Sequence, residues 1–303
     1  RRRRRRRTAK VNLSWHPRNA EAMVNFPKKG AGLYELMQRM DGKRDPLLMK
    51  IIRNMSLWTY NIQMALSPEA VNVQGAYEQR GLWGRHVDAL LDMLQDQQGH
   101  RDEDLLVELL GTLANLTVLD LPRTAKDPNP RWATRVRHRD LLGFLSKYLI
   151  PGMAQSDVVL EVVMVIGALL QDGSVAPLLA ASTIPRLLFD LWGDKADTDE
   201  EIKLQLLFTF FRLLSHPETR DELLYGTRCV SEVLGCLGSP HPAIRATANL
   251  CLDIVVECDR KTPEEAAAEK AANAAGRGGG GGGLGGEGKG GEGKGGEGDA
   301  FDQ

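Results

Sequence analysis

Apolar residues recur every three or four positions along most of the chain, with leucine abundant and alternating β-branched residues rare. This spacing places the apolar residues on one side of a helix, so it predicts helix after helix and no sheet. Five segments share one pattern, in which a short apolar helix and a polar break precede a longer apolar helix. The longer helices are predicted at Leu47–Trp58, Leu105–Thr117, Val158–Gln171, Ile202–Ser215 and Ala243–Glu257.

The spacing of these five helices indicates the kind of repeat. Their first residues lie 58, 53, 44 and 41 positions apart, and this spacing approaches the roughly 40–47 residues of armadillo and HEAT repeats. Each long helix is apolar on nearly all sides, as expected for a helix packed between neighbouring repeats. We therefore predict an all-α, armadillo-type right-handed α-solenoid with a long concave surface. A capping box at Thr198–Glu201 is expected to begin the fourth long helix.

The predicted organisation has a solenoid between two low-complexity ends. Residues 1–29 are expected to be poorly ordered, and about five repeat units fill residues 30–259, with a long insert at residues 120–139. A short Ala-rich helix is predicted at residues 260–276. Residues 277–303 are predicted to be disordered, because Gly/Glu/Lys repeats bury too little apolar surface to offset the backbone entropy.

The net charge differs between these segments. The chain carries −1, but Arg1–Arg7 contribute seven positive charges, so the remainder carries −8. The tail from Arg277 to Gln303 contributes −2 of this, which leaves −6 on Thr8–Gly276. The arginine run suits nonspecific binding to polyanions, although a low-complexity end without such a role is the alternative. The solenoid itself is therefore acidic.

Composition argues against several classes of protein. No run of 18 apolar residues is present, so we expect no membrane span, and no apolar region follows the arginines as in a secretory signal. Four cysteines are too few for a disulfide scaffold, which favours a reducing, cytoplasmic compartment. The chain begins without methionine, so we expect it to be a fragment of a longer protein.

Residues with metal or catalytic chemistry do not form a familiar motif. Cys229 and Cys236, and likewise Cys251 and Cys258, are seven residues apart. That spacing separates them by about 10.5 Å along a helix, too far for two sulfurs at about 2.3 Å from one zinc ion. The six histidines form no metal-binding motif, and no nucleophile, phosphate-loop or paired-carboxylate motif occurs. We expect no metal, no cofactor, no small-molecule substrate and no enzyme activity.

Two asparagines occupy the same point of two long helices. Asn54 lies in IRNMS and Asn115 in LANLT, and with Asn12 they are the three N-x-S/T glycosylation sequons of the chain. Glycosylation is not expected inside helices of a protein without a secretory route. An asparagine at this point of an armadillo helix can bind an extended peptide, and the alternative is that it satisfies local backbone groups. In the third to fifth units, Gly167 and Ala168, Leu213, and Val255 lie near this point, so a ladder of asparagines would be short.

The insert at residues 120–139 carries a local charge of +4 on an acidic solenoid. It suits docking of an acidic partner, a phosphate or a microtubule surface. A solvated loop is the alternative, and Trp132 within it either anchors a partner or tucks against the solenoid.

The ordered series of helix sequences is similar to the armadillo region of the kinesin-associated protein family, the non-motor subunit of heterotrimeric kinesin-II. The similarity covers about residues 30–259. It rests on LLMKIIRNMS (47–56), ELLGTLANLTVLDL (108–121), LLGFLSKYLIPG (141–152), DVVLEVVMVIGALLQD (157–172), HPETRDELL (216–224) and HPAIRATANLCLDIVVECD (241–259).

This resemblance implies an adaptor without a motor or nucleotide site. Such a subunit binds the tail region of the two motor chains and connects them to cargo, including intraflagellar transport particles moved along cilia. It would be cytoplasmic, associated with the cytoskeleton and present in cilia. Polar contacts to a partner are predicted on the concave surface at Arg53, Asn54, Asn115 and Arg212. Specific nucleic-acid binding and membrane insertion are not implied.

The sequence also departs from the family pattern, and other armadillo proteins are alternatives. The insert is longer than expected, and an acidic Trp-containing stretch is missing after the last helix. If the chain is a fragment, as we expect, an N-terminal portion with further repeats would also be missing. An import receptor or junctional scaffold is one alternative, although the five tryptophans do not recur at one repeat position as an import receptor would require. A recognition arm of an enzyme is the other.

Overall fold

The computed structural model describes residues 11–26, 31–57, 77–96, 102–117, 132–196 and 198–260. These residues form helices joined by turns, and no strand occurs among them. In chain order the helices are α2 (Pro17–Asn25), α3 (Ala31–Lys43), α4 (Pro46–Leu57), α6 (Tyr77–Asp96), α7 (Glu103–Thr117), α8 (Trp132–His138), α9 (Leu141–Leu149), α10 (Ser156–Leu169), α11 (Ala176–Ala180), α12 (Ile184–Lys195), α13 (Glu200–Leu214), α14 (Pro217–Gly226), α15 (Cys229–Gly235), the 3₁₀ helix η2 (Cys236–Gly238) and α16 (Pro242–Arg260).

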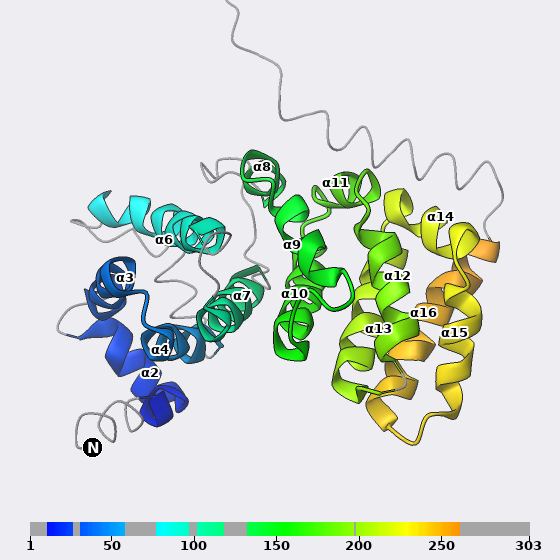
Figure 1. The fold of residues 1–303 in the computed structure, drawn as a ribbon, viewed down its shortest axis with the longest axis horizontal. Coiled ribbons are helices and arrows are strands. Elements are labelled where there is room, and N and C mark those ends of the chain that lie inside the picture. The colour runs from blue at the N-terminus through cyan, green and yellow to red at the C-terminus, as the bar shows by residue number, and fades with distance from the viewer. Residues whose placement is uncertain are drawn as a thin grey trace, which may run out of the picture.

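The helices α4, α7, α10, α13 and α16 form a continuous row, which we call the helix row. Each packs against the next one, and the shorter helices α9, α12 and α15 lie beside α10, α13 and α16 (Figure 1). The five helices of the row are the five long helices predicted from the sequence, with ends that differ by a few residues. The predicted all-α solenoid is confirmed.

One apolar core runs through the described part of the solenoid, from Val11 to Cys251. Its residues come from every helix of the row, and the largest fully buried side chain is that of Phe210 in α13. Burial on several sides explains why the row helices are apolar nearly all round. None of the described helices is both long enough and apolar enough to cross a membrane.

The N-terminal boundary of the solenoid differs from our expectation. Residues 1–29 were expected to be poorly ordered, but residues 11–14 form a helical turn and residues 17–25 form α2. Val11, Ala20 and Val24 lie in the core. The expected start at residue 30 is therefore wrong, because these few apolar residues suffice to pack a short helix that Pro17 begins at its first position.

The cap of α13 is also one residue away from the predicted position. Asp199, rather than Thr198, is the N-cap, and its carboxylate accepts hydrogen bonds from the backbone N–H of Glu201 and Ile202 at 3.1 and 3.0 Å. Thr198 instead donates to the Lys195 carbonyl oxygen at 3.2 Å. A carboxylate at this end also suits the positive pole of the helix dipole.

The described part of the insert is a helix rather than a solvated loop. Helix α8 buries Trp132, and the Arg135 guanidinium lies 3.4 Å from Asp88 of α6. Arg139, just after α8, contacts Asp88 at 3.2 Å and Asp92 at 2.9 Å. These arginines therefore bind within the chain. Residues 120–131 of the insert, the predicted Ala-rich segment after residue 260 and the predicted disordered ends lie outside the described residues.

Candidate protein-binding surface

Asn54 and Asn115 connect neighbouring helices of the solenoid. The Asn54 Nδ2 donates to the Val11 carbonyl oxygen at 3.2 Å and to Ser14 Oγ at 3.1 Å. The Asn115 Nδ2 makes the same pair of bonds one unit further on, to the Arg53 carbonyl oxygen at 3.4 Å and Ser56 Oγ at 3.0 Å. The two side chains are thus successive members of one ladder.

The serines of this ladder explain the sequons. Ser14 Oγ donates to the Val11 carbonyl oxygen, and Ser56 Oγ donates to the Arg53 carbonyl oxygen, both at 2.7 Å. Each hydroxyl is then an acceptor for the asparagine of the next unit. The sequon at Asn54 and Ser56 therefore supplies both a donor towards the preceding unit and an acceptor for the following one.

The ladder bears on the predicted peptide contacts. Asn54 is only 4% exposed, and its amide donates within the chain, which matches the alternative that these asparagines satisfy local groups. We assign Asn54 a structural role. Asn115 is half-buried, so a contact from its side chain to a partner stays a prediction.

We expect Asn54→Ala to lower the free energy of unfolding by about 1–3 kcal/mol, because it removes two hydrogen bonds and leaves a buried space beside polar atoms. Urea unfolding of the whole chain measures this change. Asn249→Ala, at an exposed position of α16, is the matched control, and we expect an effect within about 0.5 kcal/mol. Equal effects of the two substitutions would contradict the ladder.

Arg53 joins three helices of the row through ion pairs. Its guanidinium contacts Glu161 of α10 through Nη2 and lies 3.4 Å from Glu108 of α7 through Nη1. Glu108 also forms an ion pair with Lys50, whose Nζ lies 3.2 Å from Glu108 Oε1. The side chains of Glu108 and Glu161 are only 10% and 7% exposed, and that of Arg53 is 23% exposed. We call Lys50, Arg53, Glu108 and Glu161 the Arg53 network.

Gly111 of α7 makes the reach of Arg53 to α10 possible. A Cβ atom added at Gly111 would overlap the guanidinium of Arg53. The arginine side chain therefore crosses α7 where that helix has no side chain. Glycine costs about 0.5–1 kcal/mol in a helix relative to alanine, so this position is explained by the close approach rather than by helix formation.

Burial raises the pKa of the Glu161 carboxyl, and the nearby Arg53 guanidinium only partly opposes this. A carboxyl whose pKa is raised in the folded state contributes stability that is fully present below the unfolded pKa, near 4.5, and is lost as the pH rises through the folded pKa. The stability of the protein should therefore fall over this range above pH 4.5.

We expect Glu161→Gln to flatten the dependence of the unfolding free energy on pH above 4.5, because glutamine does not titrate. Urea unfolding at several pH values measures the slope. The control is Asp253→Asn, at an exposed position of α16, which should retain the slope of the wild type. A slope in Glu161→Gln equal to that of wild type would count against this assignment.

Arg212 lies on α13 against two aromatic rings of the same helix. Its Cζ is 5.1 Å from the ring centre of Phe208 and 5.6 Å from that of Phe211. Its Nε is buried and has no hydrogen-bond acceptor among the described residues. Burial lowers the pKa of Arg212. Of the four predicted site residues, the structure brings only Arg53, Asn54 and Asn115 together.

Three of the four cysteines lie in the core near the last turn of the solenoid. Cys229, Cys236 and Cys251 are buried, whereas Cys258 is half-buried. Burial, reinforced by the neighbouring thiols, raises the pKa of Cys229 and Cys251 to about 12. No group of three His, Cys, Asp or Glu residues placed to hold a metal ion occurs in the part of the chain that the structure describes.

We expect iodoacetamide at pH 8 to label Cys258 in the folded protein but to leave Cys229 and Cys251 largely unmodified, because the thiolate is the reactive form. Mass spectrometry of tryptic peptides measures the modification at each site. The same reaction in urea is the control and should label all of them. Modification of Cys251 as fast as Cys258 in the folded protein would contradict the burial.

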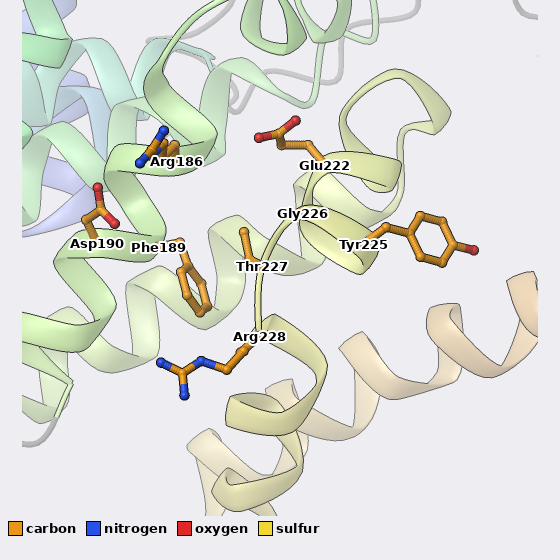
Figure 2. Close-up of a pocket in the computed structure, with 8 residues that line it drawn as sticks. All are labelled: Arg186, Phe189, Asp190, Glu222, Tyr225, Gly226, Thr227 and Arg228. Atoms are coloured by element: carbon orange, nitrogen blue, oxygen red, sulfur yellow. The ribbon is translucent and has the colours of Figure 1, made fainter.

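A separate cavity of about 600 Å³ opens between α12 and α14. Its lining includes Arg186, Phe189 and Asp190 of α12, Glu222 and Tyr225 of α14, and Arg228 of the turn that follows. Figure 2 shows the Phe189 ring between the two arginines, while the Tyr225 ring points away from the other labelled side chains. No helix-row residue lines this cavity, and its two cations and two carboxylates give no preference for one sign of charge.

The sequence interpretation missed several of these residues. Glu108 and Glu161 each stand in the middle of a row helix with apolar residues on both sides, and this placement of an acid was the available signal. The cavity had no such signal, because its lining residues fall in two groups, residues 186–190 and 222–228, that are far apart in the sequence and show no unusual pattern.

Comparison with known proteins supports the fold and gives the family. An engineered protein solved by a structural genomics consortium matches with a TM-score of 0.58 at 15% identity, covering 83% of this chain and 89% of that chain. A designed armadillo repeat protein in complex with the peptide (KR)4 matches with a TM-score of 0.55 at 13% identity, covering 82% and 90%. These likenesses define the molecule as an armadillo-type α-solenoid.

The family follows from a different comparison. The family model described as kinesin-associated protein (KAP) matches residues 8–276. The match covers most of the chain, including every described helix. The chain therefore belongs to the kinesin-associated protein family.

Proposed function

We propose that this chain is a non-catalytic adaptor that binds the tail region of the kinesin-II motor subunits and links the motor to cargo. The observation that carries the proposal is the family match over residues 8–276. The helix row supports it, because stacked helices of this kind offer an extended binding surface. A designed protein of the same fold was solved with a bound peptide.

The helix row is the surface that we propose for the motor tails. It carries partly buried apolar residues on three successive helices, namely Leu160 and Met164 of α10, Leu204 and Phe211 of α13, and Val255 of α16. Arg212 adds a cation beside them. Affinity at such a surface comes from a few well-packed residues rather than from the whole contact area. Contacts from Arg53 and Asn115 to the tails are part of this proposal.

The setting of the proposal is microtubule-based transport, including anterograde transport within cilia. The adaptor is accordingly placed in the cytoplasm, on the cytoskeleton and in the cilium. Its cargo is proposed to be intraflagellar transport proteins or another protein assembly rather than a small molecule.

Affinity purification of the tagged chain from a ciliated cell tests this function. The expected result is recovery of two kinesin heavy chains in equal amounts. A designed armadillo repeat protein with the same tag is the control and should recover neither. Recovery of other partners, with both motor chains absent, would overturn the proposal.

A further inference from the structure

Arg212 is an arginine without an acidic partner in the described ranges of the solenoid. Among the described residues no carboxylate lies within ion-pair distance of it, and its buried Nε lacks an acceptor. The side chain is half-buried and lies along Phe208 and Phe211. The rings hold the guanidinium against α13 but offer no hydrogen-bond acceptor, so one N–H stays unsatisfied.

Arg53 lies near the equivalent point of α4, and its charge is neutralised by acids of the same chain. Arg53 directly precedes Asn54, and Arg212 directly precedes Leu213, which occupies the corresponding point of α13. Arg53 is neutralised by acids on the next two helices of the row.

Arg212 has no such acid among the described residues. Of the helices that follow α13 in the helix row, the structure describes α16 (Pro242–Arg260), and no carboxylate of α16 forms an ion pair with Arg212. The described chain thus builds a site for a carboxylate at Arg212 and does not supply the carboxylate.

An unsatisfied N–H on a partly desolvated cation is unfavourable, and a carboxylate is the group that satisfies it best. Pairs of arginine and carboxylate form short, charge-assisted hydrogen bonds with defined geometry. The two phenylalanine rings beside the cation favour an apolar neighbour next to that carboxylate. A nucleic acid fits poorly, because its binding depends on many phosphate contacts, whereas Arg212 is a single cation beside two aromatic rings and matches a single carboxylate.

We propose that Arg212, Phe208 and Phe211, which we call the Arg212 cluster, dock an acidic segment of a partner chain. A Glu or Asp carboxylate of that segment pairs with the guanidinium, and apolar residues beside it cover the two rings. The inference rests on the proposed function for the identity of the partner, because the motor tails are the candidate source of the segment. The proposal specifies that the partner segment carries a carboxylate next to apolar residues.

Binding of two probes to the whole chain tests this docking. The first probe is a recombinant pair of kinesin-II motor tails, and the second is a fluorescein-labelled peptide of alternating glutamate and leucine. We expect Arg212→Gln to weaken binding of both by at least about 10-fold, as is typical when one member of a partly buried charge pair is removed. A peptide of alternating lysine and leucine should bind weakly to wild type and to the variant alike.

The matched control is Arg228→Gln, an exposed arginine of the α12–α14 cavity, which should bind both probes like wild type. Thermal unfolding by circular dichroism establishes that each variant is folded. Arg212→Lys keeps the charge and should recover part of the affinity.

The Arg212→Lys variant also identifies the partner carboxylate. A carbodiimide couples a lysine amine to a carboxylate in contact with it, forming an amide while the reagent takes up the water. Mass spectrometry should find a new cross-link from position 212 to a Glu or Asp of the bound tail, absent from wild type and from Arg228→Lys.

Three results would overturn the docking proposal. The first is equal affinity of wild type and Arg212→Gln for the motor tails, which would leave the proposed function standing. The second is a cross-link from position 212 to a carboxylate of this same chain without partner, because the acid would then be internal. The third is equal binding of the glutamate peptide by wild type and variant. Motor tails that bind to neither protein would instead count against the proposed function, while the glutamate peptide still decides the docking chemistry.

Discussion

Replacement of Arg53 by alanine is expected to lower the free energy of unfolding by about 3–5 kcal/mol at pH 7. Glu161 would be left without its cation at a side-chain exposure of 7%, and removal of one member of a buried pair costs this much because the remaining charge is uncompensated. Glu108 keeps Lys50, so most of the loss arises at Glu161. Urea unfolding monitored by circular dichroism measures the change.

Gly111 provides the internal check on this explanation. Gly111→Ala should destabilise the wild type by displacing the Arg53 guanidinium from its path across α7. In the Arg53→Ala background that path is empty, so the same substitution should stabilise the protein by about 0.5–1 kcal/mol, the usual preference of a helix for alanine over glycine. The reversal of sign is the expected outcome of the double-mutant cycle. A Gly111→Ala substitution that is stabilising in wild type would show that Arg53 does not depend on this crossing.

Phe210→Ala is expected to lower the free energy of unfolding by about 3–5 kcal/mol, the usual range for removal of a buried aromatic side chain. The Phe210 ring is fully buried in α13. Its centre lies 5.6 Å from the ring centre of Trp192 and 6.4 Å from that of Phe189, both on α12. The cavity left behind would therefore separate α13 from α12.

The loss of stability in Phe210→Ala should be greatest near the contact between α12 and α13, because a solenoid is stabilised by interactions between neighbouring units. Hydrogen exchange of the folded variant should show faster exchange in α12 and α13 than in α4. Tyr225→Ala is the control, since this ring is 83% exposed, and it should change stability by less than about 0.5 kcal/mol. An equal increase in the hydrogen-exchange rate along the whole chain would contradict a local effect.

The row helices could be predicted from the sequence because each repeats apolar residues at helical spacing over at least twelve positions. The first and last residues of these helices were harder to predict, because each boundary depends on a single capping residue. The N-cap of α13, for example, is Asp199 rather than Thr198. The short α2 was missed because its few apolar residues become buried only when α3 and α4 pack against them. Periodicity is a property of one helix, whereas this burial depends on its neighbours.

The polar part of the surface was harder to predict. The asparagine positions were recognised, but the identity of their acceptors depends on Val11 and Ser14, which lie in a segment expected to be poorly ordered. Arg53 and Glu161 are 108 positions apart, and nothing local in either helix indicates that they meet. Long-range pairing of this kind follows from the stacking of units and from the absence of a side chain at Gly111.

The proposed function depends most on direct binding between this chain and the kinesin-II motor tails. The decisive measurement is the mass of the purified mixture by size-exclusion chromatography with light scattering, at concentrations of tens of micromolar. The account predicts a single complex with one copy of this chain and one copy of each of the two tails. Separate elution of this chain at its monomer mass, with folded tails present in excess, would contradict it.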